Sequence, residues 1–560
     1  MKRLVSLRSL PRRADLVKRQ CRRYSAVAES PSDAIKPYYV TTPIFYPNAA
    51  PHIGHLHTLV IADIFARHAK LCDPNRPVRF ITGTDEHGLK LQQAAEAKGM
   101  APLDFCDELS VHFRKLTKKA NVACTRFTRT TEQQHCDAVT HLWRELRDHG
   151  LIYKGRHAGW YSVSDETFYP ATQVCQQEKD GVVYHISTIT GSRVEWQEED
   201  SYKLRLNEFR LRLLDHYLIH NPEAIQPPQF RADVKNMLLD GVEDLSISRR
   251  RSRLHWGIPV PDDPEHTIYV WIDALTVYLS SVGFPWKTKG NNGLADGWPP
   301  DVQVIGKDIL RFHAIYLPSM LMALRLPLPK NLLVHSHWTV ERTKMSKSIG
   351  NVADPVKAID EFGIDLVRYY LARVGGRFKD DVDWSQEQLQ KHSREIISLL
   401  GNLYLRATSA KIRKRVDSVP RPSISLLSST GTSALEPLLN SLKALAPTYE
   451  QNMQRFQVAD AVDTVVLALQ EANLLMTQAA PWSKDTPAAV AADVQALVFE
   501  TMRQCGILLQ PFMPEKAALL LDSLGVPPDQ RTLADAAFGK ADLADVRPGV
   551  RLFDIDMSKL

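Results

Sequence analysis

Two short signatures constrain the fold of this chain more than any other feature. The first reads His-Ile-Gly-His at residues 52–55, and the second reads Lys-Met-Ser-Lys-Ser at residues 344–348. A β-rich stretch, residues 38–42, and a turn with three prolines precede the first signature, and from His52 apolar residues recur at helical spacing. A second strand is expected over residues 78–82, followed by a helical pattern from Leu89. Strands that alternate with helices predict a parallel α/β sheet.

The two signatures also indicate a chemistry. The start of a helix presents unpaired N–H groups and a partial positive charge, which attract phosphate. His52 and His55 lie on one face of the first turn, and Gly54 leaves room for a ligand ring beside the backbone. Lys344 and Lys347 supply ammonium groups for the outer phosphates. Together these residues predict attack on the α-phosphate of ATP; a pair of surface histidines and a basic surface loop are the plain alternatives.

Positive charge is concentrated at the amino terminus. The chain has 560 residues and a net charge of +6. Residues 1–28 hold nine Lys or Arg and one Asp, a net charge of +8, so residues 29–560 carry −2. A site for RNA in the body of the chain must therefore be a local patch. The sequence contains no run of 18 apolar residues, so we do not expect a membrane span.

The first 28 residues have the composition of a targeting segment. They are rich in Arg and poor in acids, with leucines interspersed, which is typical of an amphipathic mitochondrial presequence. We therefore expect the mature protein in the mitochondrial matrix. Residues Arg22 to Ser25 resemble a matrix-protease site, which would be cleaved after Tyr24, although the sequence does not fix the cleavage site. The alternative is a basic RNA-binding arm. An apolar core of the secretory kind is missing from this segment.

The rest of the chain divides by pattern. Residues 151–245 are rich in aromatics and short polar turns, which predicts an insertion within the α/β fold. The α/β pattern resumes at residues 267–271 and 302–306. From about residue 385 to 540 the pattern is helical, interrupted by a Pro/Ser/Thr-rich loop at residues 420–433.

Further stretches between the signatures carry a resemblance to a known family. They are Thr-Thr-Pro-Ile-Phe-Tyr-Pro-Asn at 41–48, Thr-Gly-Thr-Asp-Glu-His-Gly at 82–88 and Tyr-Val-Trp-Ile-Asp-Ala-Leu at 269–275, with supporting matches at 305–308 and 311–313. With both signatures, the chain resembles class I aminoacyl-tRNA synthetases, and among them the methionyl-tRNA synthetases, from about residue 38 to 514.

The resemblance implies an architecture. A Rossmann-like parallel-sheet catalytic domain would occupy residues 29–150 and 246–345, interrupted by a connective domain at 151–245. A loop with the second signature and a stem-contact linker would follow at 346–388. An all-α helical-bundle anticodon-binding domain would occupy residues 389–545, with a tail at 546–560.

The resemblance also implies site residues. Methionine would lie between apolar walls, with its α-ammonium group paired to Asp85; the walls would be Ile44, Tyr46, Trp271, Ala274, Leu275, Tyr278, Ile309 and His313. A thioether is soft and apolar, so aromatic walls suit it. ATP would contact His52, Gly54, His55, Gly306, Asp308, Lys344, Met345, Ser346 and Lys347, with residues 335–338 on the same side. Taken singly, the apolar residues are more often core than ligand contacts.

The implied partner is tRNA(Met), read by the helical region. Asn402 and Arg406 lie four residues apart on one helix face, and Trp482 follows Pro481. The resemblance assigns these three to the anticodon, because unpaired bases stack on aromatic rings and bond to Arg and Asn. A loop-packing aromatic is the alternative for Trp482, and helix surface is the alternative for Asn402. We expect a monomer, because no appended barrel follows the helical region.

The chain departs from many relatives in its expected metal content. Ser162 and Ser164 stand where those relatives carry Cys-x-x-Cys pairs, and only Cys175 is nearby. Four soft ligands for tetrahedral zinc are therefore lacking, so we expect a zinc-free insertion held by aromatic packing. The seven cysteines form no C-x-x-C pair and are expected as reduced thiols. Mg²⁺ would accompany ATP, bound mainly by phosphates and water.

The predicted reaction is methionine–tRNA ligation through a methionyl-adenylate. The 293 residues from His52 to Lys344 leave little space for the large editing domain of the isoleucine, valine or leucine enzymes. A cysteine enzyme would hold zinc, which the missing Cys pairs disfavour. Two alternatives stay open: another amino-acid specificity, and a non-catalytic RNA-binding protein that keeps the synthetase fold.

Overall fold

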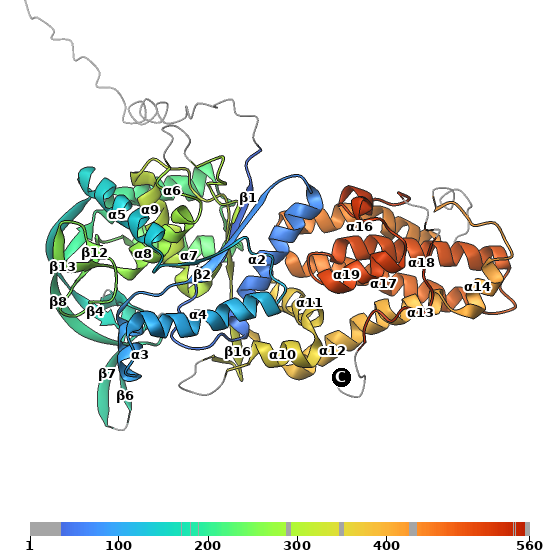
Figure 1. Cartoon of the computed structure of the whole chain (residues 1–560), viewed down its shortest axis with the longest axis horizontal. Helices are drawn as coiled ribbons and strands as arrows, with labels where there is room; N and C mark the ends of the chain where they lie inside the picture. Colours follow the sequence, from blue (N-terminus) through green and yellow to red (C-terminus); the bar gives the residue numbers. More distant parts are fainter. Residues whose placement is uncertain are drawn as a thin grey trace, which may run out of the picture. The chain divides into compact units, whose positions relative to one another are not determined.

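The computed structural model describes residues 35–169, 171–179, 181–188, 190–286, 293–345, 352–424, 434–540, 543 and 545–554 (Figure 1). The chain separates into two units, residues 1–35 and 36–560, and every element below belongs to the second. The expected presequence lies outside the described residues, and so do Ser346 and Lys347 of the second signature.

A six-stranded, fully parallel sheet forms the centre of the first half of the chain. Its strands lie in the order β3-β2-β1-β14-β15-β9. Their bounds are β1 (Tyr38–Thr41), β2 (Val78–Thr84), β3 (Arg126–Arg129), β9 (Ile225–Gln226), β14 (Val302–Gly306) and β15 (Leu332–His335). The inner strands β1, β14 and β15 are mostly buried and largely apolar, as expected where a parallel sheet is covered on both faces, whereas β3 at one edge reads Arg-Phe-Thr-Arg and is half-buried.

Helices cover the sheet and link its strands, among them α2 (Ile53–Cys72), α3 (Leu89–Ala97), α4 (Pro102–Lys119), α5 (Gln133–Asp148), α7 (Pro228–Asp240), α8 (Val270–Ser280) and α9 (Leu317–Ala323). Helix α2 packs on β1, β2 and β14 and is buried over most of its surface. Its amino end lies at the carboxyl ends of the strands, where open α/β sheets bind ligands. The sheet therefore positions the first signature at a binding edge.

The chain between α5 and α7 forms an antiparallel sheet, with strand order β5-β4-β8-β7-β6. Its strands are β4 (Ile152–Ser162), β5 (Thr167–Tyr169), β6 (Val174–Lys179), β7 (Val182–Ser187) and β8 (Arg193–Leu204). Aromatic contacts hold it: the ring centroids of Tyr161 and Phe168 lie 4.9 Å apart, and those of Trp160 and Trp196 lie 5.6 Å apart. Strand β9 falls within residues 151–245 but pairs with the parallel sheet.

The α/β pattern that resumes at residues 267–271 does not continue the parallel sheet there. Residues 267–268 end β13 (Asp263–Ile268), which pairs antiparallel with β11 (Ser248–Arg250) and β12 (Pro259–Val260) rather than joining the parallel sheet. Helix α8 begins at Val270, with Tyr269 as its N-cap residue. The apolar run at 267–271 reads as a strand because buried strands and buried helices share that pattern over short lengths.

Helices fill the last third of the chain (Figure 1). They are α10 (Pro355–Phe362), α11 (Ile364–Gly375), α12 (Gln386–Ile396), α13 (Leu403–Ala407), α14 (Ala410–Val416), α16 (Glu436–Gln454), α17 (Val458–Ala479), α18 (Ala488–Leu509) and α19 (Pro514–Ser523). The predicted fold class, a parallel α/β domain with an inserted domain followed by an all-α region, is confirmed. Over the described ranges, no helix combines the length and hydropathy of a membrane span.

One apolar core joins the two halves of the molecule. It runs from β1 and α2 through α11 to the helices that follow. Arg368 of α11 is fully buried within it, and its Nη2 lies 2.6 Å from Oδ2 of Asp63 on α2. The same guanidinium donates to the carbonyls of Pro511 and Phe512, between α18 and α19. Arg368 thus connects the parallel sheet's main helix to the carboxyl-terminal helices.

Candidate active site

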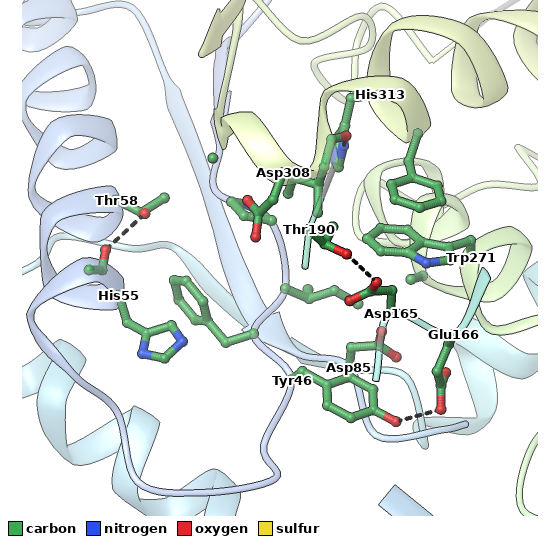
Figure 2. Close-up of a pocket in the computed structure, with 18 of the residues that line it drawn as sticks. Tyr46, His55, Thr58, Asp85, Asp165, Glu166, Thr190, Trp271, Asp308 and His313 are labelled. Atoms are coloured by element: carbon green, nitrogen blue, oxygen red, sulfur yellow. Dashed lines mark hydrogen bonds between the residues drawn. The ribbon is translucent and has the colours of Figure 1, made fainter. Parts of the chain in front are cut away.

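A cavity of about 360 Å³ opens at the carboxyl ends of β1, β2 and β14 (Figure 2). Residues of both signatures and of the intervening matched stretches line it. They include Ile44, Tyr46, His52, Gly54, His55, Asp85, Trp271, Ala274, Leu275, Gly306, Asp308, His313 and Met345. Tyr278, Ile309, His335, His337 and Trp338, which lie outside the matched stretches, also line the cavity. Figure 2 shows His55 of α2 and Trp271 of α8 on opposite sides of the cavity.

His52 and His55 close the first turn of α2 with a reciprocal cap. The Nδ1 of His52 accepts the backbone N–H of Gly54 at 3.1 Å, and the Nδ1 of His55 accepts the backbone N–H of His52 at 3.0 Å. A neutral imidazole that accepts at Nδ1 carries its proton at Nε2. Both rings line the cavity as Nε2–H donors at a helix amino terminus, the arrangement that binds phosphate.

The capping geometry explains why residue 54 is a glycine. A Cβ atom at Gly54 would lie 2.9 Å from Cε1 of His52, so any side chain would displace the capping ring. One turn later, the Thr58 hydroxyl lies 2.8 Å from Nε2 of His335. Burial lowers the pKa of His335 to about 4, so this ring is neutral at physiological pH. These contacts fix the first turns of α2 against β15.

The other end of the cavity is apolar and aromatic. The rings of Trp271 and Phe312 stack with their centroids 3.7 Å apart and their planes at 5°. His313 donates from Nδ1 to the Ile309 carbonyl at 3.0 Å and accepts the Tyr278 hydroxyl at Nε2, at 2.6 Å. Burial lowers the pKa of His313 to about 4, which keeps the ring neutral. The polar atoms of Tyr278 and His313 therefore satisfy each other.

Asp85 is the exception within this apolar end. Its carboxyl group is buried, and its Oδ1 has no hydrogen-bond partner among the described residues. Burial, with the nearby carboxylates of Asp273 and Glu166, raises the pKa of Asp85 well above its usual value. A cationic ligand in the cavity would supply the missing charge partner and favour the ionised form.

A second buried carboxylate lies beneath the cavity and is fully paired. Asp273 of α8 contacts Nδ1 of His87 at 2.6 Å and Nε2 of His135 at 2.7 Å. Burial alone would raise its pKa, but the two imidazoles lower the pKa of Asp273 to about 2. His135 also contacts the Ser280 hydroxyl at 2.8 Å. Asp273 is therefore ionised, and its charge adds to the field that raises the pKa of Asp85.

The insertion contributes an acid to the same cavity. Glu166, in the turn between β4 and β5, accepts the backbone N–H of Lys90 at 2.6 Å and the Tyr46 hydroxyl at 3.2 Å (Figure 2). Burial raises the pKa of Glu166 to about 7. A Cβ atom at Gly88 would lie 2.3 Å from the Glu166 carboxylate, so this contact needs glycine there.

The neighbouring Asp165 organises the turn between β4 and β5, which follows Ser162 and contains Ser164. Its carboxylate accepts hydroxyl groups from Tyr169 at 2.9 Å, Thr190 at 2.6 Å and Ser192 at 2.8 Å. Its backbone N–H donates to the Ser162 hydroxyl at 3.2 Å. Hydroxyl–carboxylate bonds therefore connect the turn between β4 and β5 to Thr190 and Ser192, which lie between β7 and β8.

The second signature reaches the cavity through Met345, whose side chain is buried in its wall. Lys344 belongs to β17 (Thr343–Lys344), which pairs with β16 (Trp338–Val340). The proposed contacts of Ser346 and Lys347, like the side chain of Lys344, lie outside the described residues. On the same side, Nε2 of His337 lies 3.2 Å from Oδ1 of Asp308.

Comparisons with known proteins identify the family to which the chain is similar. Residues 38–408 match the family model of class I tRNA synthetases (M), and residues 428–553 match the anticodon-binding domain of methionyl tRNA ligase. A probable mitochondrial methionine–tRNA ligase of Neurospora crassa is 44% identical over 524 residues, which is 90% of this chain and 83% of the relative. The mitochondrial methionine–tRNA ligase of Homo sapiens is 40% identical over 515 residues, 89% of this chain and 86% of the relative.

This chain belongs to the methionyl-tRNA synthetase family. A crystal structure of the Mycobacterium tuberculosis methionyl-tRNA synthetase with bound methionyl-adenylate matches it with a TM-score of 0.84 and 37% identity. The match covers 92% of this chain and all of that structure. The family predicted from the sequence is therefore confirmed, whereas the roles of individual site residues stay predictions.

The helical region brings two of the three expected anticodon residues together. The Arg406 guanidinium lies 5.4 Å from the ring centroid of Trp482, and the Trp482 side chain is 40% exposed. Asn402 is exposed one turn before Arg406. The cation–π contact positions the indole while its side chain stays partly exposed, and its role in binding a base stays a prediction.

Several cavity residues escaped the sequence analysis. Phe312 and Glu166 are the clearest examples: Phe312 lies inside the matched stretch 311–313 but was assigned no role, and Glu166 lies in the insertion, outside every matched stretch. Phe312 is adjacent to His313 in sequence. Its role in the cavity wall follows from its stacking on Trp271, which is visible only in the folded structure. Glu166 comes from the insertion, some 80 residues from Gly88 in sequence, so no local pattern reveals their contact.

Proposed function

We propose that this synthetase is a methionine–tRNA ligase that activates methionine with ATP and transfers it to the 3′ end of tRNA(Met). The observation that carries the proposal is one continuous cavity. Its apolar end holds the Asp85 carboxyl group, whose Oδ1 has no hydrogen-bond partner among the described residues, and its other end presents His52 and His55 at the start of α2. The family match and the relatives' names support the same activity.

Methionine recognition combines charge with fit. The substrate's α-ammonium group pairs with Asp85, and its side chain lies against the stacked Trp271 and Phe312 rings. The apolar wall also includes Ile44, Tyr46, Ala274, Leu275, Tyr278, Ile309 and His313. Aromatic walls suit a thioether, although an apolar pocket separates ligands that differ by one methylene by only about 1–3 kcal/mol.

Adenylate formation follows from the other end of the cavity. The methionine carboxylate attacks the α-phosphate of ATP, and pyrophosphate leaves. The amino end of α2 and the Nε2–H groups of His52 and His55 stabilise the charge that develops on the phosphate. Gly54, Gly306, Asp308 and Met345 line the nucleotide side. Lys344, Ser346 and Lys347 contact the outer phosphates, and Mg²⁺ accompanies ATP as its phosphate-bound ion.

Transfer completes the reaction. A hydroxyl of the terminal ribose of tRNA attacks the adenylate's carbonyl carbon, and AMP leaves. Asn402, Arg406 and Trp482 read the anticodon, since an exposed indole and a neighbouring guanidinium offer stacking and hydrogen bonding to splayed bases.

The cellular setting is part of the proposal. The Arg-rich, acid-poor residues 1–28 and the mitochondrial names of the relatives support import into the mitochondrial matrix. The bonds that Asp165 makes across the insertion turn support a zinc-free insertion. The domain limits and the monomeric state stay predictions, and the molar mass in solution tests the latter.

Amino-acid-dependent exchange of pyrophosphate into ATP, measured across the twenty amino acids, tests the proposal. Methionine should drive exchange far above the others. Lys347→Ala should slow exchange while leaving methionine affinity nearly unchanged, since its charge acts in the transition state. Exchange driven by another amino acid, or RNA binding without any exchange, would replace the proposal with one of its two alternatives.

A further inference from the structure

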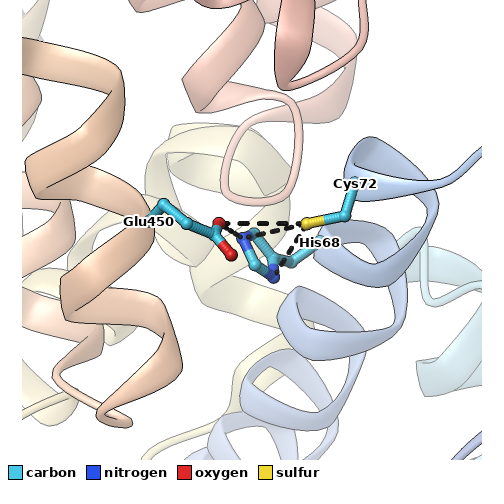
Figure 3. Close-up of side chains that lie close together, drawn as sticks. All are labelled: His68, Cys72 and Glu450. Atoms are coloured by element: carbon cyan, nitrogen blue, oxygen red, sulfur yellow. Dashed lines mark hydrogen bonds and ion pairs between the residues drawn. The ribbon is translucent and has the colours of Figure 1, made fainter.

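The carboxyl end of α2 and the middle of α16 bring three metal-binding side chains together (Figure 3). They are His68, Cys72 and Glu450. The Nε2 of His68 lies 3.0 Å from Oε2 of Glu450 and 3.6 Å from Sγ of Cys72, and the Cys72 sulfur lies 3.9 Å from the same Oε2. Among the described residues, no other group of three His, Cys, Asp or Glu side chains is this close.

The separations of the three donor atoms approach those of a tetrahedral site. With Zn–N and Zn–O bonds of about 2.1 Å and a Zn–S bond of about 2.3 Å, ligand atoms in a tetrahedron lie about 3.4–3.6 Å apart. The observed separations of 3.0, 3.6 and 3.9 Å differ from these by a few tenths of an ångström. The Cys72 sulfur also lies 3.8 Å from Nδ1 of His68, so it faces the ring, and the imidazole would have to rotate to direct Nε2 at an ion shared with the other two atoms.

The backbone favours this arrangement. His68 and Cys72 lie four residues apart on α2, which places both side chains on one helix face. Glu450 is oriented by Gln454, whose Nε2 donates to the other carboxylate oxygen at 2.7 Å. Metal-binding carboxylates commonly have such a partner. The Cys72 side chain is exposed, so an ion has a path from solvent.

We propose that His68, Cys72 and Glu450 form a site for a transition-metal ion of the zinc class, with a water molecule as the fourth ligand. Sulfur, imidazole and carboxylate ligands together suit a borderline-soft divalent ion better than Mg²⁺ or Ca²⁺. On binding, the Cys72 thiol releases its proton to solvent, and the thiolate sulfur bonds to the metal.

The position of the site gives it a mechanical consequence. Helix α2 has 20 residues, about 30 Å of helix, with His52 at its cavity end and Cys72 at the other. Glu450 belongs to the segment that matches the anticodon-binding domain. A bound ion would therefore cross-link the helix that carries the first signature to the anticodon-binding region.

Cobalt titration of the full chain, stripped of metal beforehand, tests the proposal. A thiolate ligand gives Co²⁺ a near-ultraviolet charge-transfer band, and Zn²⁺ should abolish that band by displacement. We expect one equivalent of Co²⁺ per chain in the wild type. Cys72→Ser should abolish the band, and Glu450→Gln should weaken Co²⁺ binding tenfold or more. Cys175→Ser, at an exposed cysteine of β6, is the matched control and should bind as the wild type does.

Thermal unfolding provides a second readout. Zn²⁺ should raise the unfolding temperature of the wild type and of Cys175→Ser, because a ligand that binds only the folded state stabilises it. Zn²⁺ should leave the unfolding temperature of Cys72→Ser unchanged. Methionine-dependent pyrophosphate exchange reports whether each variant is folded. A wild type without the cobalt band, or a band that persists in Cys72→Ser, would show that the cluster is only a hydrogen-bonded contact between helices.

Discussion

The Tyr46 hydroxyl lies 3.2 Å from Oε1 of Glu166, and this contact connects the insertion to the wall of the cavity. Tyr46 follows β1, whereas Glu166 lies between two strands of the insertion. Glu166 adopts a φ of 50°, which is uncommon for residues other than glycine, asparagine and aspartate. The backbone N–H of Lys90 holds the same carboxylate at 2.6 Å. The insertion thus completes the cavity rather than merely interrupting the sheet.

Glu166 should make stability depend on pH. Burial raises its pKa from the usual 4.5 to about 7. The folded state therefore holds this proton more tightly than the unfolded chain, so its contribution to stability falls as pH rises from about 4.5 to 7, by roughly 3 kcal/mol at most. Glu166→Gln keeps an acceptor and removes the ionisation. The variant's unfolding temperature should gain on the wild type between pH 5 and pH 8; a constant difference would contradict the raised pKa.

Asp85→Asn should separate binding from stability. The amide cannot pair with the ammonium group of methionine, and losing one partner of a buried charge pair costs about 2 kcal/mol or more, roughly thirtyfold in Kd. The unliganded fold should not suffer, because the Asp85 carboxyl is buried without a cationic partner among the described residues. Calorimetric methionine titration and thermal unfolding measure the two effects. Equal methionine affinity in variant and wild type would remove Asp85 from the ammonium site.

Asp273 should make stability depend on pH in the direction opposite to Glu166. Despite its burial, His87 and His135 lower the pKa of Asp273 to about 2, below its usual 3.8. Its ionised form therefore stabilises the fold above pH 3.8, and that contribution of roughly 2 kcal/mol is lost as pH falls towards 2. Asp273→Asn should lower the unfolding temperature at pH 7, and the gap to the wild type should narrow at pH 3. A gap that widens in acid would show that the two imidazoles do not hold the carboxylate ionised.

The sequence predicted the parts of the site that local pattern carries. The strand–turn–helix around His52 is visible in sequence because the apolar spacing changes at the turn and the helix begins with its capping residue. The same holds for the helical third of the chain, where long apolar periodicity sets the helices.

Contacts between distant segments were not predictable in this way. The His87–Asp273–His135 cluster joins residues more than 100 positions apart, and Glu166 meets Gly88 and Tyr46 only after the insertion folds. The α/β pattern expected to resume at residues 267–271 does not add a strand to the parallel sheet, for a related reason. Its short apolar run is shared by buried strands and helices, and tertiary packing decided the outcome.

Arg368 should be a major source of stability between the two halves of the chain. Its guanidinium pairs with Asp63 and donates to carbonyls near α19, with no exposure. Arg368→Ala leaves these buried groups without a donor, at a cost of about 3–5 kcal/mol. Arg377→Ala is the matched control, since Arg377 is 63% exposed and its ion pairs with Asp460 and Asp463 contribute about 1 kcal/mol or less. Similar losses of unfolding temperature in both variants would contradict the assigned role.

Trp482→Ala should weaken the use of tRNA while leaving methionine activation intact. The indole is 40% exposed beneath the Arg406 guanidinium, so removing it should cost the fold little. Stacking of a base on an aromatic side chain contributes about 1–3 kcal/mol, which predicts roughly a five- to 150-fold rise in the KM for tRNA. Trp196→Ala, at a 58% exposed tryptophan of the insertion, serves as the control and should leave that KM unchanged. If pyrophosphate exchange falls in parallel with aminoacylation in Trp482→Ala, the indole supports the fold rather than the anticodon.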